Sequence, residues 1–459
     1  MESPIERRAG SATAALRGPG GHKWPGGYKW YVAAVLCLAH TVAIIDRFVM
    51  VLVSELARSD LHLSDTQLGL LQGTGFSILY CGFAVPLGAV ADAANRRNLI
   101  FLGLVVWSVA TMAAAFATSF ATLFATRIFV GMGEACLIPA GMSLLASWFA
   151  PAELGRGTAI MGLGANLGYG LAFLGGGVVL AELARAGGLP VPGLGLVAPW
   201  KGAFVLAGAL AIPVLVLLAF MREAPRHGQG GGRLASRLAA TGRGLGYLSA
   251  NLRGYAPFLL VAALTAVTGY AMTSWSSSLF VRAHGLSPAA AGKLIGLVGI
   301  VAGPLGTLSG GVLLDRLRAW GVAGAPLVIM AGGSVVALAT VAGAGYAASL
   351  PLAIALFALF MFESTFTLSS VYAGMQILTV DAFRGVAASF NMMIYTLAGL
   401  GLGPAAVGMI SDRLQGPHGL AGALTLVEAA MAMVIVPTAL LARRSYQARA
   451  VLVAATRDM

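Results

Sequence analysis

The feature that most constrains this 459-residue chain is the recurrence of apolar runs about 20 residues long. An α-helix of that length crosses a hydrocarbon core roughly 30 Å thick. Because an open strand cannot satisfy its backbone in lipid, the runs predict an all-α membrane protein with twelve transmembrane helices. We expect the helices at residues 30–56, 67–91, 98–117, 120–146, 157–182, 200–221, 255–281, 289–314, 324–346, 350–378, 386–411 and 419–442.

The composition excludes a soluble enzyme. Hydrophobic residues make up 58% of the chain, charged residues 10%, and the mean hydropathy is +0.85. A soluble domain has about 45–50% apolar and 25% charged residues. The net charge of +12 therefore indicates basic loops beside anionic lipid, and no nucleic-acid partner is expected. Cys37, Cys81 and Cys136 lie inside apolar runs and are interpreted as core residues, with no disulfide and no metal site.

The distribution of Lys and Arg predicts the orientation. If both termini are cytoplasmic, most of the 29 basic residues fall in inner tails and loops, and Arg47 and Arg127 fall inside helices. The positive-inside rule then predicts a multi-pass protein of the plasma membrane, and the Ala- and Gly-rich composition favours a bacterial inner membrane. The outer loops carry six basic residues: Arg58, Arg185, Lys201, Arg282, Lys293 and Arg413.

The chain divides into two halves with tails and a linker. We expect a disordered cytoplasmic tail at 1–27, six-helix bundles at 28–221 and 255–442, a cytoplasmic linker at 222–254 and a cytoplasmic tail at 443–459. The linker is either a solvated connection or a short helix on the inner membrane surface, since its Arg233 and Arg237 lie one helical turn apart.

An internal repeat supports the two bundles. Gly69 and Gly292 are separated by 223 positions, and so are the pairs Gly88–Gly311 and Asp92–Asp315. Two six-helix units with pseudo-two-fold symmetry form the major facilitator fold, in which substrate binds between the units near the midplane. The short loop after the second helix resembles the major-facilitator signature, Gly-x3-Asp-x3-Arg-Arg. We interpret the loop and its repeat as a latch that closes the cytoplasmic side: Gly88, Asp92, Arg96, Arg97, Gly311, Asp315 and Arg316. The alternative is ordinary anchoring of helix ends by charges.

Four charges inside helices are the strongest candidates for function. Asp46 and Arg47 lie deep in the first helix, and Arg127 and Glu134 lie two turns apart on one face of the fourth. A charge in hydrocarbon costs at least about 2.5–3.5 kcal/mol, so these four should pair or face an aqueous cavity. We expect Glu134 and Asp46 to carry protons and Arg127 to pair with them, while Arg47 meets an anionic headgroup. The alternative is a static ion-pair network between two helices.

The motifs around these charges resemble those of the Spinster-like lipid transporters. The run from Arg127 to Ala135, Arg-Ile-Phe-Val-Gly-Met-Gly-Glu-Ala, is similar to that family's fourth-helix motif, and Asp46-Arg47 to its first-helix pair. The resemblance covers residues 40–175. It implies proton-driven movement of a sphingolipid or lysophospholipid by alternating access. Related organic-anion symporters carry similar motifs, so an organic-anion or drug transporter of the same fold remains an alternative.

Several further residues are candidates for the substrate cavity. They are polar or aromatic side chains in the first, seventh and tenth helices, and each has a simpler interpretation as a packing residue: His40, Tyr270, Trp275, Glu363, Phe366, Tyr372 and Met375. Glu428, in the outer part of the last helix, is interpreted as a residue near the membrane interface. A non-transporting receptor or scaffold is the remaining alternative. No enzyme activity, cofactor or metal is expected, and the protein is expected to be a monomer.

Overall fold

The computed structural model describes residues 27–455 except 192–194, 225–233, 415 and 417. Within the helices, the side chains of residues 85, 89, 92, 93 and 234–241 are not described. The predicted tail at 1–27, apart from its last residue, therefore lies outside the described residues. In the described part of the chain, eleven helices are long and apolar enough to span a membrane. The helix from Asp65 to Ala93 joins them as the twelfth, as the sequence predicts.

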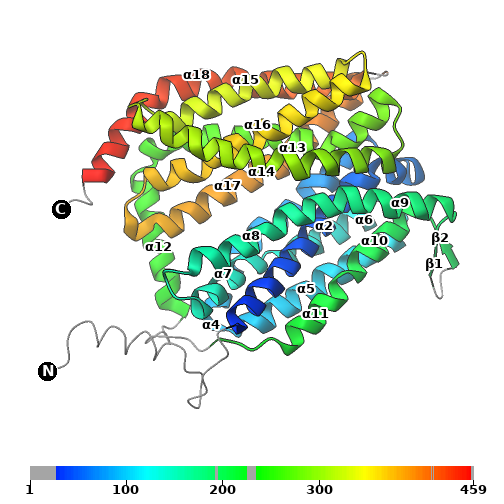
Figure 1. Ribbon diagram of the computed structural model, residues 1–459, viewed down its shortest axis with the longest axis horizontal. Coiled ribbons are helices and arrows are strands. Elements are labelled where there is room, and N and C mark those ends of the chain that lie inside the picture. Colours follow the sequence, from blue (N-terminus) through cyan, green and yellow to red (C-terminus); the bar gives the residue numbers. More distant parts are fainter. Residues whose placement is uncertain (1–26, 192–194, 225–233, 415, 417, 456–459) are drawn as a thin grey trace.

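The first bundle holds six of these helices, several of which are built from shorter segments (Figure 1). The fourth helix breaks at Ala135 and Cys136, a break that its apolar run does not reveal. The segments are α2 (Tyr28–Leu61), α3 (Asp65–Gly69), η1 (Leu70–Thr74), α4 (Gly75–Ala93), α5 (Arg96–Ala113), η2 (Ala114–Phe116), α6 (Phe120–Glu134), α7 (Leu137–Trp148), α8 (Leu154–Gly170), η3 (Leu171–Gly175), α9 (Gly176–Arg185), α10 (Pro199–Ala209) and α11 (Ala211–Phe220).

The second bundle holds the other six helices, preceded by a helix in the linker. The last helix continues to Ala455, beyond the predicted end at 442. The segments are α12 (Leu234–Ala250), α13 (Leu252–His284), α14 (Pro288–Ala319), α15 (Ala325–Tyr346), α16 (Leu350–Ile377), η4 (Asp381–Phe383), α17 (Arg384–Leu414) and α18 (Gly419–Ala455).

Helix ends follow local capping signals in the sequence. Ser64 accepts a hydrogen bond from the Gln67 amide, and the Gln67 side chain accepts one from the Ser64 amide, which forms a capping box at the start of α3. Ser119 and Thr122 form the same arrangement at α6. Gly285 ends α13 in the left-handed region, with φ of 66°, which a residue without Cβ adopts without strain.

One element departs from the all-helical expectation. Two short antiparallel strands, β1 (Leu189–Val191) and β2 (Gly195–Val197), form a hairpin between α9 and α10. Because the hairpin lies outside the membrane helices, its edges are not confined to hydrocarbon. We call the side of the protein with this hairpin and the loop at 62–64 the hairpin face, and the opposite side, with α12 and the loop at 94–95, the linker face.

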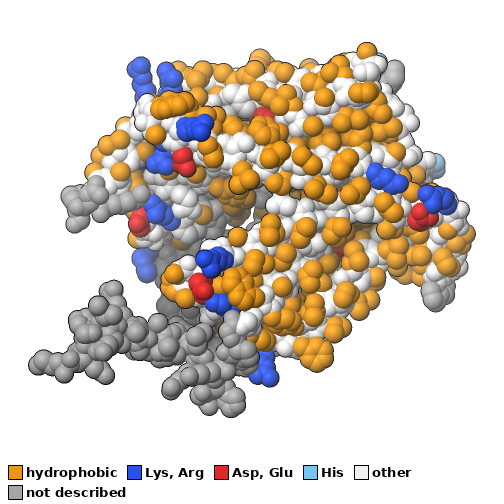
Figure 2. Space-filling view, viewed as in Figure 1, with side chains coloured by type: hydrophobic (Ala, Val, Ile, Leu, Met, Phe, Trp, Pro, Cys, Tyr) orange, Lys and Arg blue, Asp and Glu red, His pale blue; other side chains and the backbone are white. Residues whose placement is uncertain are grey.

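The bundles are joined near the hairpin face and diverge towards the linker face (Figure 1). Thr74 Oγ1 donates to the Gly401 carbonyl at 2.6 Å, and the hydroxyls of Ser54 and Ser278 lie 3.1 Å apart. On the linker side, Gly82 and Gly385 have no neighbouring atom within 4 Å of an added Cβ. Figure 2 shows the surface hollowed between the bundles on this side, with hydrophobic side chains covering the flanks.

The linker helix α12 spans the diverging ends. The Tyr247 ring stacks on Phe383 of η4 with centroids 4.6 Å apart, and α12 also contacts α4 of the first bundle. Of the two arginines that suggested a linker helix, Arg233 lies outside the described residues and the Arg237 side chain is not described. The linker therefore contains a helix that packs on both bundles.

Candidate functional site

The four charges predicted from the sequence meet where α2 and α6 cross. We call Asp46, Arg47, Arg127 and Glu134 the central charge cluster. Arg47 Nη2 donates to Glu134 Oε2 at 2.6 Å, and the two side chains are 14% and 2% exposed. This pair differs from the expected one, in which Arg127 is the partner of the carboxylates.

Arg127 binds the backbone of α2 instead. Its Nη1 donates to the Asp46 carbonyl at 3.1 Å and its Nη2 to the Arg47 carbonyl at 3.3 Å. The side chain is 1% exposed. Its positive charge thus sits beside both acids while its hydrogen bonds fix α2 against α6. In this conformation Arg127 therefore stabilises the packing of α2 on α6 and forms no ion pair with the carboxylates at hydrogen-bond distance.

Asp46 is the least compensated member of the cluster. Its side chain is completely buried, and neither carboxyl oxygen has a hydrogen-bond partner. The indole N–H of Trp107 and the hydroxyl of Thr111, both on α5, face this carboxyl and are the polar groups that interact with it, without a well-aligned hydrogen bond. Burying a carboxyl group with so little compensation is costly, which sets Asp46 apart from the hydrogen-bonded Glu134.

Both bundles contribute to the surroundings of Arg47. Its guanidinium carbon lies 4.4 Å from the centroid of the Phe76 ring and 5.5 Å from that of Tyr80, both on α4. Tyr270 of α13 also interacts with it across the bundle junction, and the Tyr270 and Tyr395 rings are 6.1 Å apart. Aromatic faces attract a guanidinium electrostatically. Phe76, Tyr80 and Tyr395 are not recognisable from the sequence, because they lie in apolar stretches typical of ordinary packing.

A second group of charges joins the bundles at the hairpin face. We call Glu55, Arg58, Asp65, Arg282 and Asp412 the hairpin-face cluster. Arg282 binds both oxygens of Asp65 at 2.7 Å and Glu55 at 2.9 Å. Arg58 lies 3.1 Å from Asp65. Such bidentate, charge-assisted bonds are among the stronger polar contacts in proteins.

Asp412 completes this cluster from α17. Its carboxylate accepts the backbone N–H groups of Asp65 and Thr66 at 2.8 Å each, and the Thr66 hydroxyl at 2.6 Å. It therefore caps the start of α3 across the bundle junction, where the helix dipole favours a negative charge. This cluster is not recognisable from the sequence, because charged residues at helix ends are typical of residues that anchor a helix at the membrane interface.

The predicted cytoplasmic latch residues form no bond between the bundles in this conformation, as far as the described residues show. Arg96 is buried and donates to Glu223 at 2.6 Å and to Ser147 at 2.7 Å. Arg97 donates to the carbonyls of Leu218 and Ala219. These contacts lie within the first bundle and, at Glu223, with the start of the linker. Gly88 faces Pro139, Gly311 faces open space, Asp315 and Arg316 are exposed, and the Asp92 side chain lies outside the described residues.

The predicted cavity residues separate into two groups. Tyr270 is partly exposed and Tyr372 is exposed, and the two interact with one another near the bundle junction. The others have structural contacts: Trp275 donates to the Pro404 carbonyl at 3.0 Å, Met375 and Phe366 pack in the second bundle, Glu363 accepts from Thr367, and His40 Nδ1 lies 3.0 Å from the Met161 carbonyl. The three cysteines are free and buried, as expected for core residues.

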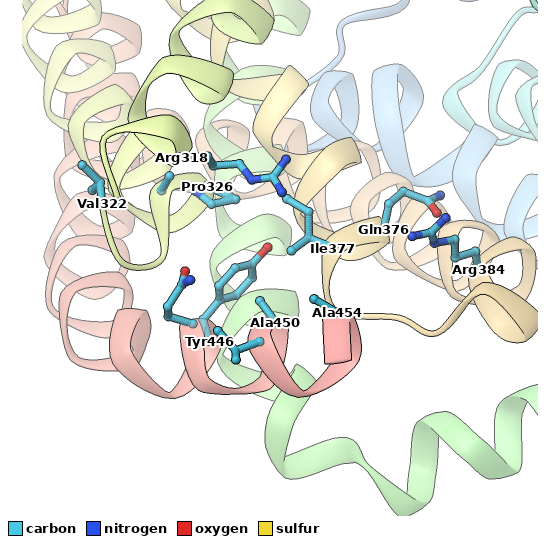
Figure 3. A pocket seen from close by; sticks show the side chains of 13 residues that line it. Arg318, Val322, Pro326, Gln376, Ile377, Arg384, Tyr446, Ala450 and Ala454 are labelled. Carbon is cyan, nitrogen blue, oxygen red and sulfur yellow. The ribbon is translucent and has the colours of Figure 1, made fainter. Parts of the chain in front are cut away.

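A separate pocket opens at the linker face of the second bundle (Figure 3). Its volume is about 580 Å³, and Arg318, Arg384 and Tyr446 contribute polar groups to its walls. The Tyr446 hydroxyl is already bound to the Gly374 carbonyl at 2.8 Å, and Arg384 pairs with Asp381 at 3.2 Å. The pocket is thus distinct from the central charge cluster and belongs to α14, α15, α16, α17 and α18.

Comparison with known proteins agrees with this architecture. Residues 36–404 match the sequence profile of the Major Facilitator Superfamily. The chain is 29% identical over 416 residues to an MFS-type efflux pump of Mycolicibacterium smegmatis, covering 87% of this chain and 89% of that protein. It is 26% identical over 409 residues to protein spinster homolog 1 of Rattus norvegicus, covering 84% and 73%.

A solved structure shows the same arrangement. A bacterial homologue of the human lysosomal transporter Spinster, in an inward-facing and unoccupied conformation, superposes with a TM-score of 0.75 at 25% identity and covers 92% of this chain and 97% of that one. The profile match covers most of the chain, and the solved structure has the same two-bundle fold. The chain is therefore a multi-pass membrane transporter rather than an enzyme. It belongs to the Major Facilitator Superfamily, in which it resembles the Spinster homologues.

Proposed function

We propose that this protein is a proton-coupled secondary transporter that moves an amphiphilic lipid of the sphingolipid or lysophospholipid type by alternating access. The observation that carries the proposal is the 2.6 Å ion pair between Arg47 and Glu134, buried beside the carboxyl group of Asp46 near the junction of the bundles. A titratable pair at this place can respond to both protons and substrate.

The coupling follows from competition for Arg47. When Glu134 is ionised, it holds the guanidinium. When Glu134 takes up a proton, the charge that holds Arg47 disappears, and Arg47 becomes free to bind an anionic headgroup. By thermodynamic linkage, a bound headgroup raises the affinity of Glu134 for its proton by the same factor. Asp46 supplies a second carboxyl group, which interacts electrostatically with Glu134 and Arg127.

The surroundings of Arg47 suit an amphiphile. The guanidinium offers planar hydrogen-bond donors to a phosphate or carboxylate. The rings of Phe76, Tyr80 and Tyr270 offer apolar faces next to it. A headgroup bound at Arg47 would thus place its acyl chain among aromatic side chains from both bundles. Similarity to Spinster homologues supports a lipid of this class.

A second candidate is proton-coupled transport of an organic anion or drug, by symport or antiport, in the same fold. The similarity to an MFS-type efflux pump favours it. The two candidates differ in the substrate rather than in the coupling, because a carboxylate and a phospholipid headgroup both bind a guanidinium. A direct comparison of substrates separates them.

The proposed orientation places the linker face in the cytoplasm of a bacterial cell, with both termini on that side and the protein acting as a monomer. Figure 2 shows Lys and Arg side chains gathered mainly towards the linker face, as the positive-inside rule requires of the cytoplasmic side. In this orientation the conformation described is inward-facing. The hairpin-face cluster must then separate when the protein faces outward.

The test is uptake into proteoliposomes containing the purified protein. We compare a lysophospholipid, a sphingoid base and a small carboxylate, with and without an inward proton gradient. Couplings of this kind are typically about 5- to 150-fold. We expect the gradient to accelerate transport of the amphiphile by a factor in that range, and Glu134→Gln to lose the acceleration while substrate exchange without a gradient continues.

The control is Glu182→Gln, which removes an exposed carboxylate paired with Arg185 on α9. This variant should behave as the wild type. Gradient-driven uptake that persists in Glu134→Gln contradicts the proposed coupling. Transport of the carboxylate alone would instead favour the second candidate.

A further inference from the structure

Two more carboxyl groups lie buried in the second bundle, away from the central charge cluster. Glu363 is about 20 Å along α16 from the hairpin face, and Glu428 about 14 Å along α18, at 1.5 Å per residue. Their exposed fractions are 8% and 0%. Glu428 is therefore enclosed by protein, whereas its sequence position suggested a place near the membrane interface.

The contacts of the two groups are sparse. Glu363 Oε1 accepts the Thr367 hydroxyl at 2.7 Å, and Gly333 of α15 leaves room for it, since an added Cβ would overlap this oxygen. Neither oxygen of Glu428 has a hydrogen-bond partner. The two carboxyls interact electrostatically with each other. α15 lies between their helices and packs against both.

No described cation faces the pair. α15 contributes no charged side chain, and its single tyrosine, Tyr346, lies at its outer end. From α17, Tyr395 faces Glu363, and from α13, Tyr270 lies beside Tyr395. The remaining charged side chains on the helices that pack around the pair lie towards the helix ends: Arg253, Arg282, His284, Lys293, Asp315, Arg316, Arg318, Arg384, Asp412, Arg413, Arg443, Arg444 and Arg449.

The pair must therefore be neutral in this conformation. An isolated ionised carboxylate costs many kcal/mol in a low-dielectric interior, and a second one beside it adds repulsion. Without a cation to compensate, each carboxyl retains a proton. In the central charge cluster, the Arg47–Glu134 ion pair stabilises the charged forms. Glu363 and Glu428 have no described cation beside them, so only a bound proton removes their charge.

A polar path leads from this pair to the bundle junction. Tyr395 interacts electrostatically with both Glu363 and Tyr270, and an added Cβ on Gly269 would lie 3.2 Å from the Ser364 hydroxyl and 4.0 Å from that of Tyr395. Tyr270 in turn interacts with Arg47. Tyrosine side chains thus lie in the region between the buried acids and the site at which substrate is proposed to bind.

We infer that Glu363 and Glu428 form a second proton-binding site, which releases a proton when the second bundle rearranges during the transport cycle. The inference rests on the proposed proton-coupled function, and it adds a proton that the central charge cluster does not carry. A purely structural role would leave both carboxyls protonated in every state.

The first test detects the protons directly. Infrared difference spectra of the purified protein, recorded with and without the transported lysophospholipid, report carboxylic C=O groups that gain or lose a proton. We expect a negative carboxylic-acid band in the wild type that disappears in Glu428→Gln and is retained in Glu182→Gln. The same measurement with sodium in place of the substrate should give no such band.

The second test counts protons per cycle from the reversal potential of transport in proteoliposomes. Glu428→Gln mimics the protonated carboxyl, so the variant should fold and transport with a lower proton-to-substrate ratio. An unchanged ratio together with an unchanged band overturns the inference, and so does a sodium-dependent band. A loss of coupling in Glu134→Gln is independent of both readouts, so the two proposals fail separately.

Discussion

Single charges carry most of the information about function in this molecule. Asp46, Arg47, Arg127 and Glu134 are recognisable from the sequence because each interrupts an apolar run. Their pairing is not recognisable, because it depends on how α2 and α6 cross. Helical spacing places Arg127 and Glu134 on one face of α6, yet Arg127 contacts backbone carbonyls and Glu134 contacts Arg47.

The contacts of Arg127 give a prediction about stability. Arg127→Gln removes two hydrogen bonds from a charged donor to the carbonyls of Asp46 and Arg47, each worth about 1.5–3 kcal/mol. We expect a clearly lower unfolding temperature in detergent, followed by intrinsic tryptophan fluorescence. Arg185→Gln, which changes an exposed arginine on α9, is the control and should unfold as the wild type does. Equal unfolding temperatures for the two variants would show that Arg127 does not hold α2.

At the scale of elements, the run lengths predict the twelve helices and most of their ends within a few residues. They do not predict the break at Ala135–Cys136 or the π-helical segments η1 and η3. A π segment changes the hydrogen-bond pattern by one residue, and an apolar run does not record such a change. The sequence does not predict the strands β1 and β2 either, because the stretch that holds them is short and rich in Gly and Pro.

The capping of α3 by Asp412 gives a prediction about the two conformations. Asp412→Ala removes three hydrogen bonds at the start of a helix, and loss of such a cap typically costs about 1 kcal/mol. We expect roughly a fivefold shift of population from the state closed at the hairpin face. Distances between spin labels at Ala186→Cys and Ala348→Cys, measured with the three buried cysteines replaced by Ala, should show a larger fraction of long distances. Arg413→Ala, next to it on an exposed position, is the control and should leave the distances unchanged.

At the scale of the whole molecule, the internal repeat predicts two bundles but not the conformation in which they are found. The 223-residue offset relates Gly69 to Gly292 and Gly88 to Gly311. In the structure, Gly69 and Gly292 contact the opposite bundle, while Gly88 and Gly311 do not. The two pairs of equivalent glycines therefore lie at opposite faces, one pair at the closed face and the other at the open face, and only the coordinates reveal which face is closed.

The opening at the linker face and the proposed orientation together predict which side of the membrane gives access. Ser389 lies on the linker-side part of α17 and is exposed. In a background without the native cysteines, Ser389→Cys should react rapidly with a membrane-impermeant maleimide in inside-out vesicles and slowly in right-side-out vesicles. Ala348→Cys, at the hairpin face, should show the reverse preference. The opposite pattern for both residues would invert the proposed topology.

The close approach of the bundles at the hairpin face has a consequence for sequence variation. Gly69 lies against the Pro404 carbonyl and Gly177 against the backbone of Ala289, so that an added Cβ at either glycine has no space. A substitution at these positions would act as a wedge that props this face apart without touching a charge or a substrate contact. Related proteins that share the central charge cluster can therefore differ in transport rate because of a single methyl group at the bundle junction, far from that cluster.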